Sequence, residues 1–182
     1  GHPPLDLPLW RTVPAQDLRH VQLLLERDLH CPRAHGVGRL FDGVAALALV
    51  RPRAGYEGQL AMAWNHTAGD AGASPYPFLV SDGDPWVIDT RPLIRALVDD
   101  LRARADLGVV SARFHATIVA ATAQILRARA GDLPIVLTGG CFVNPLLAQG
   151  LIGELRDQDV RLQRAVPPGD GGVALGQAAV AA

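Results

Sequence analysis

The feature that most constrains the fold is the stretch from Leu133 to Gln149, LPIVLTGGCFVNPLLAQ, in which a short apolar run precedes two glycines. The run Pro134–Leu137 is typical of a buried strand in a parallel sheet whose two faces are both covered. Gly139 and Gly140 then allow a sharp turn with no side chain between the backbone and a ligand. Apolar residues recur at helical spacing from Phe142 to Leu155, so we expect a helix to open directly from the turn.

The start of that helix is a candidate binding site. The first amides of a helix have no intrahelical acceptor and carry partial positive charge, so they suit an anion or a nucleotide. A Gly-Gly turn also occurs for packing reasons alone, and for the turn by itself the packing interpretation is favoured. The surrounding elements therefore have to decide between the two interpretations.

The second half of the chain repeats this arrangement. It reads helix, strand, GG, helix, strand, DGG, helix, which indicates an α/β layered fold. The expected helices are 90–101, 109–130, 142–155 and 173–181, and the expected strands are 134–137 and 160–162. Ligands of such folds gather at the carboxyl ends of the strands. Because both glycine-rich turns follow strands, we expect them to converge on one site.

The first half is expected to be mostly helical. Residues 1–14 form an extended arm or a ragged start, followed by helices at 17–29, 35–47 and 58–66 and by an antiparallel hairpin of strands 76–80 and 86–89. The first of these helices places Leu18, Val21, Leu24 and Leu25 on one face. The second contains Asp42, whose carboxylate is costly to bury unless it is paired or bound to a ligand.

Composition limits the possible partners. The chain has 182 residues, 49% of them hydrophobic and 19% charged, which suits one globular domain. The net charge is −1 and the basic residues are scattered, so nucleic acid is not an expected partner. All 17 basic side chains are arginine, which excludes a mechanism in this chain that needs a Schiff-base lysine or a Walker-type phosphate lysine.

The cysteines and the apolar runs bear on the cellular compartment in which the protein is expected. Cys31 and Cys141 are far apart and neither belongs to a CxxC motif, so no zinc site or disulfide framework is expected. The apolar runs are short and interrupted, and no secretory signal is recognisable, so no membrane partner is expected. We therefore expect a cytoplasmic protein.

Five motifs occur in a characteristic order: GRLFD ending at Asp42, YEGQ around Glu57, FH at His115, LTGGCFVN ending at Asn144, and PPGDGGVALGQ around Asp170. In this order they resemble the carboxy-terminal half of the HypF family of hydrogenase-maturation carbamoyltransferases, which are relatives of the TsaD-type tRNA threonylcarbamoyl transferases. The resemblance implies an α/β fold that is one lobe of an actin/hexokinase-like (RNase H-like) ATPase, with a mixed sheet flanked by helices. It divides the chain into an N-terminal arm and helix, 1–30, and a nucleotide-binding lobe, 31–182.

The resemblance assigns six residues to a nucleotide: Gly38, Asp42, Glu57, Gly139, Gly140 and Asn144. Asp42 and Glu57 look like the carboxylates that accept hydrogen bonds from the ribose hydroxyls, a role that suits a carboxylate because it accepts several donors at once. Gly139 and Gly140 look like the turn over which adenosine and the phosphates lie. No residue of this chain is assigned a catalytic role.

Asp170 looks like a metal ligand that acts with two histidines of a His-x-x-x-His motif. This chain contains no such pair, because its histidines are His2, His20, His30, His35, His66 and His115. Two histidines at that spacing share one helix face and can share a metal. A divalent metal (Mg, or Fe/Zn) is therefore expected to be shared with an N-terminal lobe outside this chain.

Each of these residues also has a simpler interpretation. Asp42 can cap a helix or pair with an arginine, and Glu57 can cap the helix near Gly58. Asn144 can lie on a solvated face, and Asp170 can form an Asx-turn. Two further residues are expected to be structural, because His115 lies on an apolar helix and Cys141 has no apparent histidine or asparagine partner.

By resemblance, the complete enzyme makes carbamoyl-adenylate from carbamoyl phosphate and ATP. It transfers the carbamoyl group to the C-terminal cysteine of HypE. That group later becomes a cyanide ligand of the [NiFe]-hydrogenase active site. The expected partners are thus the N-terminal lobe, HypE, carbamoyl phosphate and ATP, with an apolar surface where the lobe docks. The alternatives are a catalytically incomplete binding or scaffolding module and a TsaD-like tRNA-modifying subunit.

Overall fold

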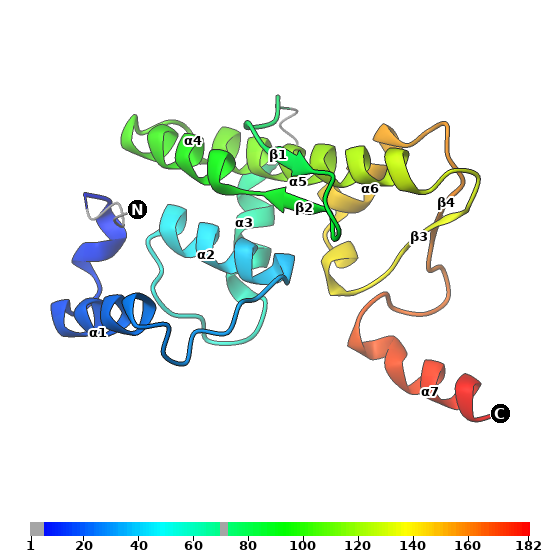
Figure 1. Ribbon diagram of the computed structural model, residues 1–182, viewed down its shortest axis with the longest axis horizontal. Helices are drawn as coiled ribbons and strands as arrows, with labels where there is room; N and C mark the ends of the chain where they lie inside the picture. The colour runs from blue at the N-terminus through cyan, green and yellow to red at the C-terminus, as the bar shows by residue number, and fades with distance from the viewer. Residues whose placement is uncertain (1–5, 70–72) are drawn as a thin grey trace.

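The computed structural model describes residues 6–69 and 73–182 and has a mixed α/β fold that is rich in helix (Figure 1). The helices are α1 (Ala15–Glu26), α2 (Val37–Leu49), α3 (Gln59–Ala68), α4 (Arg91–Arg102), α5 (Leu107–Arg129), α6 (Pro145–Glu154) and α7 (Val173–Ala181). The strands are β1 (Leu79–Ser81), β2 (Val87–Asp89), β3 (Ile135–Leu137) and β4 (Val160–Leu162), and 3-10 helices are η1 (Pro8–Arg11), η2 (Gly140–Val143) and η3 (Asp170–Gly172). Every helix predicted from periodicity is present, with shifted ends.

Helix α5 is the centre of the core. Its buried residues include Val110, Phe114 and Val119, and helices α2, α3, α4 and α6 contribute to the same hydrophobic cluster. The rings of Phe41 in α2 and Phe114 meet edge to face with centroids 4.8 Å apart, and Trp64 in α3 is fully buried in the same cluster. This packing positions α2, which carries Gly38 and Asp42, and α6, which directly follows Asn144.

The four strands form two separate pairs. Strands β1 and β2 are antiparallel, with Val80 opposite Ile88, which confirms the predicted hairpin with shorter strands. Strands β3 and β4 are parallel, with Val136 opposite Arg161, which confirms the predicted parallel pairing. In place of one continuous mixed sheet, the described residues contain two separate two-stranded sheets, one antiparallel and one parallel.

Strand β3 is covered on one face only, so the prediction that both faces are covered was wrong for this structure. Ile135 and Leu137 are buried against the core, whereas Val136 points the other way and is 60% exposed. Successive side chains of a strand lie on opposite faces, so a single covering layer leaves every second residue exposed.

The N-terminal segment is better packed than a ragged start. Leu7 and Leu9, on either side of the first residue of η1, are both buried, and Asp6 pairs with Arg102 at the end of α4. Residues 1–5 of the predicted arm lie outside the described residues.

Helices α1 and α7 have exposed apolar side chains and no buried residue. Both lie away from α5, toward the two ends of the chain (Figure 1). In α1 the predicted apolar face is present, but Val21, Leu24 and Leu25 are exposed. In α7 the exposed apolar residues include Val173 and Leu175. Two unpartnered apolar helices agree with the expected docking surface without showing what covers it.

Helix α5 is also, by length and composition, able to span a membrane. Half of its most apolar window is buried inside the protein, and the central helix of a globular core passes the same test. This feature is therefore weak support for a membrane partner.

A polar network ties the segment before β1 to helices α4 and α5. The Tyr76 hydroxyl donates to Asp100 at 2.6 Å, and Arg113 donates to the same carboxylate oxygen at 2.8 Å. The Arg113 guanidinium stacks 4.0 Å from the centre of the Tyr76 ring, and the buried Tyr76 amide donates to Thr117 at 2.7 Å. Burial and the neighbouring Asp100 carboxylate raise the pKa of Tyr76, which stays a neutral donor.

Replacing Tyr76 by phenylalanine is expected to destabilise the fold by about 1 kcal/mol, because Asp100 loses a hydrogen bond. For a chain of this size that corresponds to a melting temperature lower by about 2–4 °C, which thermal unfolding measures. Tyr56→Phe is the matched control, since Tyr56 is exposed and its hydroxyl makes no hydrogen bond within the described residues. Equal shifts in the two variants would contradict a stabilising role for the Tyr76 hydroxyl.

Candidate nucleotide site

Asp42 lies in the second turn of α2 and pairs with an arginine of the same helix. The Arg39 Nη2 atom is 2.8 Å from Oδ2 of Asp42, and the aspartate side chain is 23% exposed. Asp42 is inside the helix, so of its two simpler interpretations the ion pair is present and the N-cap is not. Gly38 lies one turn earlier, and a β-carbon there would meet no atom within 4 Å, so its surroundings are open.

Glu57 is exposed, immediately before the first turn of α3. The N-cap of that helix is Gly58, which has a φ of +79°, and no side chain caps it. The capping interpretation of Glu57 was therefore wrong. In its place, the Gln59 side chain accepts a hydrogen bond from the Gly55 amide at 2.6 Å and holds the turn from within.

The Gly-Gly turn leads into a 3-10 helix, not directly into α6 as predicted. Gly139 has a φ of +98°, a conformation that favours glycine, and Gly140 begins η2. Helix α6 starts only at Pro145, after η2 has reversed the chain. In this segment the Phe142 amide donates a hydrogen bond to the Gly139 carbonyl, and the Asn144 amide donates one to the Cys141 carbonyl. These two amides are therefore already satisfied.

Asn144 is the N-cap of α6. Its side-chain oxygen accepts from the amides of Leu146 and Leu147 at 3.0 and 3.4 Å. An asparagine directly before a proline is a typical helix start, so this role was readable from the sequence and was missed. The contact of Asn144 with a nucleotide remains a prediction, and it would use the amide nitrogen.

The two glycine-rich turns meet, as the order of strands predicts. The Gly139 amide donates to the carbonyl of Pro168 at 2.7 Å, and a β-carbon on Gly169 would lie 3.4 Å from Cα of Gly140. On the other side of this turn, a β-carbon on Gly172 would lie only 2.6 Å from the Pro167 carbonyl oxygen. The backbone at this junction is thus close-packed around glycines.

Asp170 begins η3 at the same junction and is exposed. It makes no ion pair in the part of the chain that the structure describes. Among the described residues no group of three or more histidine, cysteine, aspartate or glutamate side chains forms a metal site. A single exposed carboxylate can supply one metal ligand, if the other ligands come from another part of the complete protein.

His115 is a core residue, buried beside Phe41, the residue that precedes Asp42 in the sequence. Its Nδ1 atom lies 2.8 Å from the Ser111 carbonyl, which only accepts, so Nδ1 carries the hydrogen. Nε2 is buried and has no hydrogen-bond partner among the described residues. Burial lowers the pKa of His115, because the charged imidazolium would have to leave water.

Cys141 also has a structural environment. The side chain is half-buried against the core cluster, and burial raises the pKa of its thiol. A raised pKa disfavours the thiolate that the position near a helix start had suggested. Because Phe41, Cys141 and Phe142 contact one cluster, α2 and the Gly-Gly segment rest on the same core.

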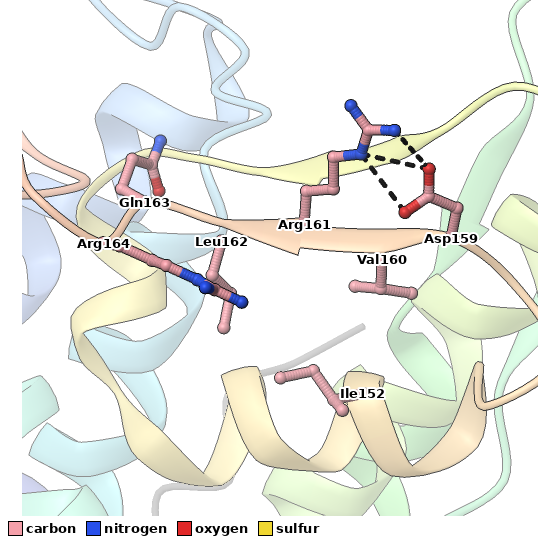
Figure 2. Close-up of a pocket in the computed structure, with 7 residues that line it drawn as sticks. All are labelled: Ile152, Asp159, Val160, Arg161, Leu162, Gln163 and Arg164. Carbon is pink, nitrogen blue, oxygen red and sulfur yellow. Dashed lines mark hydrogen bonds and ion pairs between the residues drawn. The ribbon is translucent and has the colours of Figure 1, made fainter.

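A surface hollow is present elsewhere in the structure. It lies beside β4, where Val160 and Leu162 point toward Ile152 of α6 and the Asp159–Arg161 pair lies on the other side of the strand (Figure 2). None of the predicted nucleotide residues lines it. We therefore assign the hollow no role in nucleotide binding.

Substituting alanine for Gly172 is expected to open the junction of the two turns. The new β-carbon clashes with the Pro167 carbonyl, so the bond from the Gly139 amide to Pro168 should weaken. Hydrogen exchange of the Gly139 amide should become faster, and the fold should lose about 1 kcal/mol. Gly176→Ala is the control, because a β-carbon there meets no atom within 4 Å. Unchanged exchange in Gly172→Ala would contradict the coupling.

The buried His115 makes stability depend on pH. Its folded pKa lies below the unfolded value of 6.5, so its contribution is fully present above pH 6.5 and is lost as the pH falls toward the folded pKa. The free energy of unfolding should drop by about 1 kcal/mol per pH unit in that window. Urea unfolding at several pH values should show a flatter profile for His115→Asn and the original profile for His66→Asn, a change at an exposed histidine. A steep profile in His115→Asn would assign the dependence to another group.

Residues 7–177 match the family model described as "Carbamoyltransferase, Kae1-like Domain, second subdomain". The chain is 35% identical to the carbamoyltransferase HypF of Rhodobacter capsulatus over 94% of its own length and 23% of the relative's. It is 38% identical to the HypF of Rhizobium leguminosarum bv. viciae over 82% of the chain and 20% of the relative. A HypF homolog of Cupriavidus necator is 37% identical, with 93% of the chain and 46% of the relative covered.

Two solved structures resemble this one. A crystal structure of full-length HypF in the phosphate- and nucleotide-bound form matches with a TM-score of 0.85 and 31% identity over 95% of this chain and 24% of that one. The HypF of T. kodakarensis matches with a TM-score of 0.71 at 22% identity over 90% of this chain and 22% of that one, a likeness of fold. The chain thus spans about a quarter of these proteins, and its division at residue 30 stays a prediction because the family match runs across it. The chain belongs to the HypF family of carbamoyltransferases, in which it corresponds to the second subdomain of the Kae1-like domain and has the actin/hexokinase-type fold expected of it.

Proposed function

We propose that this chain is the nucleotide-binding part of an enzyme that makes carbamoyl-adenylate from carbamoyl phosphate and ATP and transfers carbamoyl to the C-terminal cysteine of HypE. Family membership supports the carbamoyltransferase class. The nucleotide-bound state named for the HypF structure at 31% identity supports a nucleotide as the ligand. The exact chemistry and the partner HypE follow from the family resemblance.

The observation that carries the proposal is the meeting of the two glycine-rich turns through the Gly139 amide and the Pro168 carbonyl. Because glycine has no β-carbon, a phosphate can approach the backbone amides of the two turns that are not used in this contact, a mode of binding that needs no lysine. This suits a chain whose basic residues are all arginine. Asp42 and Glu57 would accept hydrogen bonds from the ribose hydroxyls, and the amide of Asn144 would contact the nucleotide.

The reaction explains why a nucleotide is needed. A carbamoyl group is a poor electrophile until it is joined to a good leaving group, and in carbamoyl-adenylate that leaving group is AMP. A divalent metal, when bound, neutralises charge on the phosphates. Asp170 would supply one carboxylate oxygen to it, and the histidines would come from the preceding lobe. This chain's contribution is to hold and orient the nucleotide.

The apolar faces of α1 and α7 support a partner lobe. Leu24 and Leu25 of α1 and Leu175 of α7 are exposed, and exposed apolar area of this kind is costly unless it is covered in the complete protein. In the relatives, this region is about a quarter of a longer chain, so another part of such a chain is a candidate to cover these two helices. We propose that the preceding lobe of the same domain packs there.

A second candidate function is that of a binding module that is not catalytic on its own. The observation in its favour is that this chain contains no His-x-x-x-His pair. The two candidates differ in whether activity appears when the preceding lobe is restored.

The chain alone is expected to bind ATP weakly and to show no carbamoyl phosphate-dependent cleavage of ATP, because it holds half of the cleft. Joined to the preceding lobe, it should bind ATP tightly by calorimetry and cleave it to AMP and pyrophosphate. Asp170→Ala should abolish that cleavage, whereas Asp157→Ala, at another exposed aspartate without an ion pair among the described residues, should not. Tight binding or turnover by the chain alone would refute the half-site, and inactivity of the joined protein would favour the binding module.

A further inference from the structure

The partner of Asp42 in the ion pair on α2 is Arg39, which has no role in the nucleotide site described above. Arg39 is in the first turn of the helix, and its side chain is 66% exposed. A cation in the first turn is opposed by the helix dipole, whereas a pair three residues apart is favourable, and the two effects are small and similar in size. Helix stability therefore gives no clear reason for an arginine at this position.

The geometry of the pair gives a different reason. The closest approach of Arg39 to Asp42 is from Nη2 to Oδ2, at 2.8 Å, and Oδ1 accepts no hydrogen bond in the described parts of the chain. A carboxylate that is fixed through one oxygen can still accept a donor at the other. The pair thus leaves one acceptor free on a half-buried side chain whose rotation is restricted.

We propose that Arg39 is a positioning residue for nucleotide binding: it holds the Asp42 carboxylate through Oδ2 so that Oδ1 accepts a ribose hydroxyl. This proposal rests on the ribose role of Asp42 proposed above. Arg39 itself need not touch the nucleotide. An acceptor that is already oriented binds more tightly, because less side-chain freedom is lost when the ligand arrives.

The proposal is tested by comparing ATP with 2′,3′-dideoxy-ATP in the chain joined to its preceding lobe. Calorimetry or equilibrium dialysis gives the ratio of the two dissociation constants, which reports contacts with the ribose hydroxyls alone. Asp42→Asn should reduce this ratio by about tenfold, the effect of losing a hydrogen bond to a charged group.

Arg39→Gln should reduce the same ratio by about three- to tenfold while leaving dideoxy-ATP binding unchanged. Arg39→Lys should restore part of the ratio, because an ammonium still holds one oxygen. In the Asp42→Asn background, Arg39→Gln should have no further effect. Arg53→Gln is the control for lost charge, since Arg53 is exposed and makes no ion pair within the described residues.

The outcomes separate two kinds of failure. If Arg39→Gln weakens ATP and dideoxy-ATP equally, the arginine contacts phosphate or acts through charge, and the positioning role is refuted. If Arg39→Gln leaves the ratio unchanged while Asp42→Asn lowers it, the positioning role is refuted and the ribose role stands. If Asp42→Asn leaves the ratio unchanged, the ribose role itself fails.

Discussion

The rest of the structure depends on the burial of one helix, α5. Four helices pack around it, and even its polar residues are accommodated there: Ser111 donates to the Trp64 carbonyl at 2.6 Å, and Thr117 donates to Arg113 at 2.7 Å. Gly150 in α6 lets that helix approach closely, since a β-carbon there would lie 2.7 Å from a methyl group of Val119. Because α2 and α6 are both held by α5, a change in this core would move both walls of the candidate site.

The candidate site is made largely of backbone. The junction of the two glycine turns depends on amides, carbonyls and the absence of β-carbons, and the exposed Asp170 begins η3 beside it. A backbone site has a fixed geometry and needs little reorganisation to meet a phosphate. It also explains how a chain whose only basic side chains are arginines can be suited to a nucleotide. In the proposed site, specificity for the ribose would depend on two carboxylates, of which Asp42 pairs with Arg39 and Glu57 is exposed.

Local sequence signals predicted most helices, the hairpin and the parallel pairing of β3 with β4, because periodicity and turn residues act over a few positions. They failed where burial depends on packing against another part of the protein and not on the segment itself. Val136 is exposed because a second covering layer is not among the described residues, and the apolar face of α1 is exposed for the same kind of reason. The start of α6 was misplaced by three residues because the cap formed by Asn144 was overlooked. Within the site, the positions of the glycine turns after two strands predicted that the turns converge, and the sequence allowed an arginine partner for Asp42 without identifying it as Arg39.

The exposed apolar faces and the proposed half-site have one proposed explanation, which is a partner lobe that covers the faces and completes the site. A surface that is apolar in this chain and covered in the complete protein stabilises the folded state only when the partner lobe is present, so docking and stability are linked. If the partner docks on α7, it also restrains the segment that carries Asp170 and the Pro168 carbonyl, since η3 runs directly into that helix. Closing the cleft would then tighten the junction on which the phosphates are proposed to lie. Binding of the nucleotide and of the lobe would be mutually favourable, because each orders the same turn.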